Sequence, residues 1–573
     1  MKMKHKKSTR IGALILGVGI LLVATATAFA QSSITAMAFA QNPKISPDLA
    51  GTNSNSVKVI VQYRHHVTPA DHKRVTRRGG AFFRELAPVN GGSYSMPVSA
   101  LADLASDPAV AYISPDRPVS VMMDNTAAAV NAAVAWSSYG LDGTGVGVAV
   151  IDSGISKHAD FNNATLVYSQ DFTGTGSTGD QYGHGEHVAG IIAGNGTSSK
   201  CPACTRTLQG IAPGVNLINL RVLDQNGAGT DSEVIAAIQQ AIALKSTYNI
   251  RVINLSLGRS VYESYTTDPL CQAVEAAWQA GIVVVVAAGN DGRDNAFGTE
   301  GYGTIYAPAN DPYVITVGSM KTNGTPDRTD DTVATYSSKG PTLVDQVVKP
   351  DIVAPGNMVV SLLASPSETL AANEPADLVP LAYYQSNGQG NSGAYFQLSG
   401  TSMAAPVVSG AAALLIQQNP KITPDQVKAL LMLTSYKEFP QSSSVTDPTT
   451  GVTYTDYYDC FTVGAGYLDI AAALANTAPL PSGTALSPTA QYDPDTNTLT
   501  VTSASSSIWS AQSSLGQQSL WGQQSVWGQQ SLWGQQSLWG QQSLWGQQSL
   551  WGQQSLWGQQ SLWGQSFLVN GEK

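Results

Sequence analysis

The chain has 573 residues, of which 43% are hydrophobic and only 12% are charged, so it can form large cores and is not disordered as a whole. Its length exceeds that of one ordinary domain, and we expect two or more folded units. The formal net charge of −10 argues against nucleic acid as the main partner, and four cysteines in so long a chain exclude a disulfide-dense scaffold.

The first residues have the pattern of a secretory signal peptide. A basic start precedes an apolar run, Ile11 to Ala30, which ends in the small-residue motif Ala28-Phe29-Ala30. A second Ala-Phe-Ala at 38–40 leaves the cleavage position open between residues 30 and 40. The length of the run leaves a retained membrane anchor as the alternative. We expect residues 1–30, or 1–40, to direct secretion to the extracellular space, with cell-surface association as a further option.

Residues 41–122 have the pattern of a small α+β unit. Val57–Val61 is β-branched and alternates, which predicts a strand. The segments 70–78 and 98–107 suit helices, and Val110–Ile113 suits a further strand. The expected order of elements is β-α-β-β-α-β.

Residues 123–475 alternate short apolar strands with helical segments. The predicted strands are Val146–Ile151, Asn216–Val222, Val252–Leu257, Ile282–Ala288 and Val314–Val317. The predicted helices are His187–Gly194, Ser232–Lys245, Pro269–Ala280, Thr401–Gln417 and one that begins after Thr423. Short buried strands that alternate with helices predict an α/β fold with a doubly wound, mostly parallel sheet and flanking helices.

The end of the chain changes composition twice. Residues 476–508 are rich in Pro, Ser and Thr and are predicted to be a linker, with a short strand at Thr498–Thr502. In residues 509–573 the hexapeptide Trp-Gly-Gln-Gln-Ser-Leu repeats, and residues 496–571 contain no charged side chain. The even period would place Trp and Leu on opposite faces of an extended chain, which would allow stacked strands or a solenoid. The alternative interpretation is a low-complexity tail without such order. Surface attachment, self-association and the binding of a polymer through its Trp side chains are the roles open to this repeat.

Three motifs carry candidate chemistry. Asp152 directly follows a predicted buried strand, at the carboxyl end where sites form in open α/β sheets. His184 lies between two glycines at a predicted helix start, where the helix dipole favours the neutral imidazole that a general base needs. Ser402 precedes an apolar helix, so its backbone N–H is free to face an oxyanion.

Each motif also has a simpler interpretation. Asp152 could cap the next turn, and Ser402 could be only a helix N-cap residue. His184 and His187 could form a His-x-x-His metal pair, although no third ligand follows at a recognisable spacing.

The order Asp152, His184, Ser402 matches the order of the triad in subtilisin. On these motifs, residues 123–475 resemble the subtilisin-like serine proteases, peptidase family S8, and residues 41–122 resemble their inhibitor-type propeptide. The resemblance implies that Ser402 is the nucleophile, that His184 is the general base and then acid, and that Asp152 orients His184.

The same resemblance assigns the substrate-binding residues. Asn290, at the end of the strand that begins at Ile282, takes the place of the side-chain oxyanion donor. Pairing with an extended peptide falls to Ser256, Leu257 and Gly258, and Ala288 and Gly289 are also assigned to substrate binding. Tyr306 falls near the floor of the pocket for the P1 side chain, which would restrict large P1 groups.

The sequence departs from the family pattern in three places. Glu186 replaces the usual Thr beside His184 and is expected to raise the pKa of that imidazole if it lies near enough. Cys201 and Cys204 lie in a loop, 195–208, where many relatives carry calcium, and they form a disulfide or stay free. Residues 365–391, ahead of Ser402, look like an insertion relative to the family pattern. We assign no metal site and no required cofactor, and structural calcium stays unassigned.

The resemblance implies an endopeptidase that hydrolyses protein and peptide substrates. Self-cleavage is expected near Met122, with residues 41–122 as an intramolecular inhibitor of the mature enzyme. The alternative is a catalytically silent scaffold that attaches to surfaces through its repeat tail.

Overall fold

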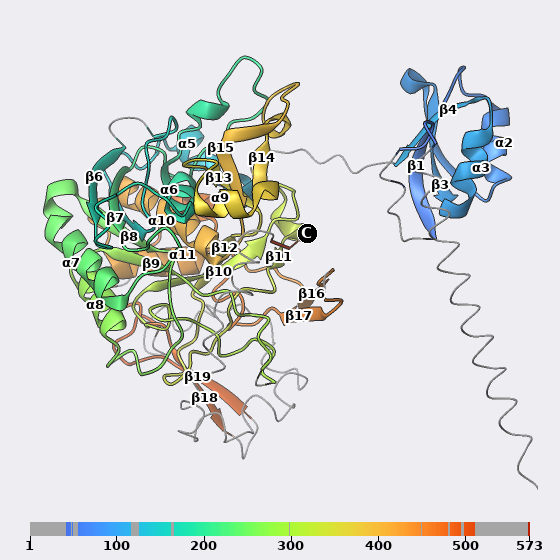
Figure 1. Ribbon diagram of the computed structural model, residues 1–573. Coiled ribbons are helices and arrows are strands. Elements are labelled where there is room, and N and C mark those ends of the chain that lie inside the picture. The colour runs from blue at the N-terminus through green and yellow to red at the C-terminus, as the bar shows by residue number, and fades with distance from the viewer. Residues whose placement is uncertain are drawn as a thin grey trace, which may run out of the picture. The chain divides into compact units, whose positions relative to one another are not determined.

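The computed structural model describes residues 42–46, 49, 55–115, 125–161, 165–296, 298–448, 450–479, 482–493, 498–509 and 571–572. The chain divides into two compact units, Met1–Ser120 and Val121–Lys573 (Figure 1). The expected signal peptide, the cleavage position near Met122 and all but a few residues of the repeat tail lie outside the described residues. Within the described part of the chain, no helix is both long enough and apolar enough to cross a membrane.

The small unit is an antiparallel sheet with two helices. Its elements in chain order are β1 Ser56–Tyr63, α2 Pro69–Thr76, β2 Ala81–Leu86, β3 Gly91–Pro97, α3 Leu101–Ser106 and β4 Val110–Pro115. The strand order is β2-β3-β1-β4. Val59 and Val61 of β1 are buried in the core with Tyr94, Met96 and Ile113, as the alternation along β1 predicts. The elements follow the expected β-α-β-β-α-β order.

The large unit is built on a mostly parallel sheet of eight strands, with the order β11-β10-β9-β8-β5-β7-β6 and β12 paired to β10. Only the pair β10–β11 is antiparallel among those described. The strands are β5 Gly147–Asp152, β6 Leu166–Asp171, β7 Asn216–Arg221, β8 Ile250–Leu255, β9 Val283–Ala287, β10 Ile315–Lys321, β11 Thr332–Val333 and β12 Ile352–Pro355. The predicted α/β class with a mostly parallel sheet is confirmed.

Helices cover both faces of this sheet (Figure 1). Helices α6 and α10 pack on each other, and α7 and α8 form a second packed pair. The helices are α4 Asn125–Ala129, α5 Ala133–Ser138, α6 His184–Ala193, α7 Asp231–Tyr248, α8 Pro269–Gln279, α9 Thr369–Asn373, α10 Thr401–Gln418, α11 Pro424–Thr434 and α12 Ile470–Ala475. Thr423 and Gln426 form the capping box that starts α11, as their spacing predicts.

Three short antiparallel sheets complete the large unit. Their strands are β13 Val359–Leu362, β14 Leu378–Pro380 and β15 Asn391–Leu398, then β16 Ser442–Thr446 with β17 Thr453–Tyr457, and β18 Thr489–Asp493 with β19 Thr498–Thr502. The predicted strand at Thr498–Thr502 is β19.

Two of the departures from the family pattern pack against each other. Cys201 and Cys204 form a disulfide. Their loop lies against the inserted segment, where the Ser386 N–H donates to the Ala203 carbonyl at 2.7 Å. The Arg206 guanidinium lies 4.2 Å from the ring centroid of Tyr383. The disulfide loop therefore supports the insertion that precedes α10.

The segment 476–508 differs from the expected linker, because much of it is packed into the large unit. Ser487 is buried, and its hydroxyl donates to Asp351 at 2.5 Å in an ion cluster that includes Lys349 and Lys428. Ile508 and Trp509 are buried against α11. The composition suggested a linker because Ser and Thr are usually exposed, whereas Ser487 has buried charged partners.

We expect Ile508→Ala to lower the free energy of unfolding by about 2–4 kcal/mol, because a side chain with 4% exposure leaves a cavity when it is truncated. Chemical denaturation measures the change. Val452→Ala is the control, since Val452 is 47% exposed and should change stability by less than about 0.5 kcal/mol. Equal effects of the two substitutions would show that residues 482–509 do not belong to the folded unit.

Candidate active site

The candidate residues gather where three neighbouring strands end. Strands β5, β8 and β9 lie side by side and run parallel. Asp152 is the last residue of β5, Ser256 follows β8, and Asn290 follows β9. The carboxyl edge of a parallel sheet is where α/β proteins place their sites.

Asp152 and His184 form a buried hydrogen-bonded pair. The imidazole Nδ1 lies 2.7 Å from Asp152 Oδ1, and the two residues are 4% and 1% exposed. The carboxylate can only accept, so Nδ1 carries the proton and Nε2 is left as a base. The same Oδ1 accepts the Ser153 N–H at 2.8 Å.

A second buried carboxylate, Asp180, holds the start of α6 in place. Its Oδ1 accepts the N–H groups of Tyr182 and Gly183, and its Oδ2 accepts the Glu186 N–H at 2.7 Å. It also accepts the Ser153 hydroxyl at 2.9 Å, and that hydroxyl accepts the Gly185 N–H. Asp180 thereby caps α6 and ties it to the residue after Asp152. This cap explains why α6 begins at His184 rather than at His187.

The pKa of His184 is raised above its ordinary value. Burial lowers this pKa, but the charge of Asp152, the hydrogen bond to it and the charge of Asp180 together outweigh burial. The expectation that Glu186 supplies this charge is wrong. Burial raises the pKa of Glu186 well above its ordinary value, and its Oε2 accepts the Ser156 N–H at 2.6 Å, so it fixes the loop after β5 instead.

His187 is a core residue. Its Nε2–H faces the carbonyl oxygens of Val359 and Phe396 at 3.1 and 3.2 Å. Burial lowers its pKa to about 3, so the ring is neutral. Across the described ranges, no group of three or more His, Cys, Asp or Glu side chains could hold a metal ion. The assignment of no metal site stays a prediction.

Ser402 is the second residue of α10 and is 8% exposed. Its hydroxyl donates to the Ser256 carbonyl at 3.1 Å, and the Ser256 hydroxyl donates back to the Ser402 carbonyl at 2.8 Å. This reciprocal pair fastens the start of α10 to the end of β8. No hydrogen bond joins Ser402 to His184 within the described residues; catalytic hydrogen bonds are often long before substrate binds.

The amide of Asn290 is oriented by Thr401. Asn290 Oδ1 accepts both the N–H and the hydroxyl of Thr401, at 2.9 and 3.1 Å. Since the oxygen is engaged by the residue before Ser402, the NH₂ group is turned away from Thr401. An amide held in this way is suited to donate to an oxyanion.

The five predicted substrate-binding residues fall into two kinds. Leu257 and Gly258 lie outside any strand, and no backbone hydrogen bond among the described residues uses their polar groups. The carbonyl oxygens of Ala288 and Gly289 already accept hydrogen bonds, from the Tyr306 N–H and the Ser338 N–H respectively. The Ser256 carbonyl accepts the Ser402 hydroxyl. Pairing with an extended peptide is therefore open to Leu257 and Gly258.

Tyr306 lies between these two segments. A Cβ added at Gly289 would come within 2.9 Å of the Tyr306 ring, and one added at Gly258 within 3.1 Å of its Cβ. The Tyr306 hydroxyl donates to Asp291 Oδ2 at 2.6 Å. Burial raises the pKa of Asp291, although the hydrogen bond from Tyr306 opposes the rise.

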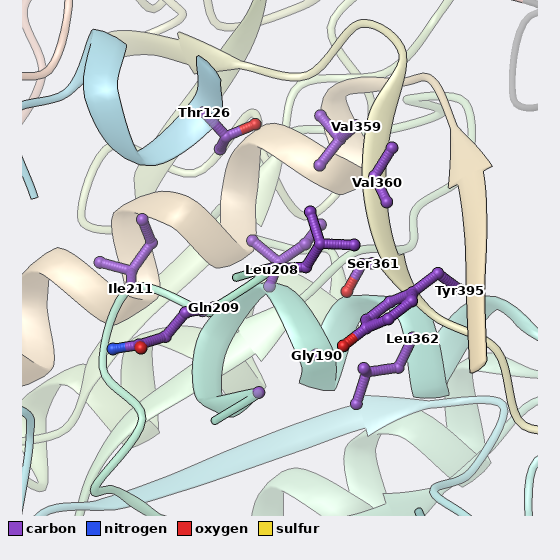
Figure 2. A pocket seen from close by; sticks show the side chains of 13 residues that line it. Thr126, Gly190, Leu208, Gln209, Ile211, Val359, Val360, Ser361, Leu362 and Tyr395 are labelled. Atoms are coloured by element: carbon purple, nitrogen blue, oxygen red, sulfur yellow. The ribbon is translucent and has the colours of Figure 1, made fainter. Parts of the chain in front are cut away.

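A pocket also lies on α6 away from these residues (Figure 2). It contacts α6 at Gly190 and Ile191 rather than at His184, and Figure 2 shows Leu208, Ile211, Val359 and Tyr395 around it. No predicted site residue lines it, so it has no direct part in the arrangement above.

Sequence reasoning missed three residues that organise the site: Asp180, Thr401 and Asp291. Asp180 precedes His184 in a polar, glycine-rich stretch, where an Asx-type cap could have been proposed. Thr401 and Asp291 adjoin predicted site residues. Their partners are distant in the sequence, so only the folded chain reveals their contacts.

Comparison with known proteins identifies the family of the large unit. The model of the subtilase family, Peptidase S8, matches residues 143–466. Serine protease AprX of Bacillus subtilis (strain 168) is 37% identical over 60% of this chain and 73% of its own. Subtilisin E of the same strain is 32% identical over 71% of this chain and 92% of its own. The extracellular serine proteinase of Thermus sp. (strain Rt41A) is 34% identical over 60% of this chain and 71% of its own.

We expect Asp180→Asn to lower the pKa of His184, because it removes one of the two negative charges that raise this pKa. An NMR titration of the ¹³C-labelled histidine rings measures the shift. Asp224→Asn, in a turn, is the control and should leave the His184 titration where it is. An unchanged His184 pKa in Asp180→Asn would show that Asp180 acts on α6 only as a cap.

Proposed function

Since the chain belongs to the subtilase family and is a serine endopeptidase, we propose that Ser402, His184 and Asp152 form its catalytic triad. The observation that carries the proposal is the buried 2.7 Å bond between Asp152 and His184 at the sheet edge where β8 holds Ser402. In the neutral imidazole this bond keeps the proton on Nδ1 and leaves Nε2 as the base, and α10 begins at the residue before Ser402.

The proposed reaction begins with proton transfer from the Ser402 hydroxyl to His184 Nε2 as Oγ attacks the peptide carbonyl carbon. Asp152 remains a carboxylate and stabilises the imidazolium that forms. The NH₂ group of Asn290 and the Ser402 N–H donate to the oxyanion of the tetrahedral intermediate. His184 then protonates the leaving amine, and water hydrolyses the acyl-enzyme by the same steps.

We propose that substrates bind as extended strands against Leu257 and Gly258, whose backbone groups are open to pairing. Main-chain pairing does not distinguish side chains, which favours a broad range of proteins and peptides. Tyr306, packed against Gly258 and Gly289, restricts large P1 side chains. No cofactor is required in this proposal, and calcium is not assigned.

Export and self-processing are also part of the proposal. Residues 1–30 direct secretion, and residues 41–122 act as an inhibitory propeptide that is cleaved near Met122. One relative is named an extracellular serine proteinase, which supports export. The β-α-β-β-α-β order of the small unit agrees with an inhibitor-type propeptide.

We expect Ser402→Ala to abolish casein hydrolysis and Asn290→Ala to lower kcat by about 10²–10³-fold, because a single oxyanion donor is worth about 3–4 kcal/mol. The Asn290→Ala rate is measured on processed protein. Ser402→Ala is assayed after an added protease has removed residues 41–122 and has itself been removed. Asn226→Ala, in an exposed turn, is the control and should keep the full rate. Processed wild-type protein without casein hydrolysis would favour the silent scaffold, and Ser402→Ala with full activity would contradict the triad.

Autoprocessing has its own test. Secreted Ser402→Ala should keep residues 41–122 attached, whereas the wild-type product should begin near residue 123. Intact-mass determination of both secreted products measures the difference, in a host that lacks other extracellular proteases. Processing of Ser402→Ala at the same position would contradict self-cleavage.

A further inference from the structure

Two residues near the end of the repeat tail, Gly571 and Glu572, are docked in the large unit. Glu572 is 3% exposed, and its Oε1 accepts Arg293 Nη2 and the Thr335 N–H, both at 2.8 Å. The Thr335 hydroxyl donates to the same oxygen. Thr335 closely follows β11 in the chain, and Figure 1 marks the C end of the chain beside β11. Glu572 is also the first charged residue after Asp495.

The main chain of this segment is bound as well. Asn357, which follows β12, donates Nδ2–H to the Glu572 carbonyl and accepts the Glu572 N–H through Oδ1, both at 2.8 Å. A side-chain amide that pairs with both backbone groups of one residue acts like the edge of a strand. Asn357 therefore binds the backbone while Arg293 and Thr335 bind the carboxylate.

The residue before Glu572 must be small. Gly571 has φ +57°, which favours glycine. A Cβ at this position would come within 2.3 Å of the Ser399 hydroxyl and 2.8 Å of Met358. The geometry of this site therefore favours a Glu that follows a Gly over an acidic residue that follows any larger residue.

The cationic group of this site is built into the fold. The Arg293 Nε donates to the Thr335 hydroxyl at 2.6 Å, and Nη1 pairs with Asp447 at 3.1 Å. The guanidinium also lies 4.6 Å from the ring centroid of Tyr454 on β17. With a side chain only 9% exposed, Arg293 is oriented by several groups besides Glu572. An arginine held in this way is suited to bind a carboxylate at small entropic cost.

We propose that Arg293, Thr335 and Asn357 form a docking site for an acidic Gly-Glu peptide segment, and that its occupant is the chain's own Gly571–Glu572. Trp509 is buried at the other end of the repeat segment. Trp509 and Gly571–Glu572, the described residues on either side of the repeats, are therefore both packed in the large unit. A cut within the repeats would then leave the distal piece bound, because the docking site holds it without a covalent link.

The test uses the full-length Ser402→Ala protein, which cannot digest itself if the proposed triad is right, with a single recognition sequence for a specific protease introduced at Gly540. After cleavage, size-exclusion chromatography and native mass spectrometry determine whether the distal fragment stays with the body. We expect it to stay, and we expect Glu572→Gln and Gly571→Ala each to speed its dissociation at least tenfold. Glu263→Gln, on an exposed side chain, is the matched control and should change nothing.

A second readout does not need the cut. In the intact chain, Glu572→Gln should speed hydrogen exchange at the Thr335 amide at least tenfold, because that N–H loses a charged acceptor. Equal retention and equal exchange in wild type and Glu572→Gln would overturn the docking site. A dimer before cleavage that Glu572→Gln dissolves would overturn the choice of occupant, because the segment would then dock on a second copy.

Discussion

The arrangement of the candidate site depends on one buried carboxylate. Asp180 receives hydrogen bonds from three backbone N–H groups at the start of α6 and from the Ser153 hydroxyl. These bonds join the end of β5 to the beginning of α6. Asp152 and His184 occupy those two positions, so their 2.7 Å contact follows from the cap. A charged acceptor out of water needs this many donors, because an uncompensated buried carboxylate would be costly.

The other half of the site is fastened by neutral hydrogen bonds. Ser402 and Ser256 pair reciprocally through hydroxyls and carbonyls, and Asn290 accepts two bonds from Thr401. Ser256 and Asn290 follow the neighbouring strands β8 and β9, and Thr401 and Ser402 begin α10, so these groups meet at one edge of the sheet. The chemistry is distributed over distant segments, but each segment ends on the same rim of one sheet.

The additions to the basic α/β unit are attached by specific contacts. The disulfide loop holds the inserted segment, and Ser487 joins a buried cluster of Asp351 with two lysines. Glu572 reaches Arg293 from beyond the repeat. Ser487 and Glu572 are polar residues in segments of loop-like composition, and each is buried against charged partners. Composition alone therefore underestimates how much of this chain is folded.

The sequence by itself determined the α/β class, the strands and helices around the motifs, and the candidate residues, because buried strands, capping boxes and glycine-flanked motifs are local patterns. Tertiary structure decided which groups act on one another. Asp152 and Asp180, not Glu186, raise the pKa of His184, and Glu186 accepts the Ser156 N–H instead. Such pairings join residues far apart in the chain or fix the direction of a side chain, and neither property is contained in local periodicity. For the same reason, the packing of residues 482–509 and the docking of Glu572 emerged only when the chain was folded.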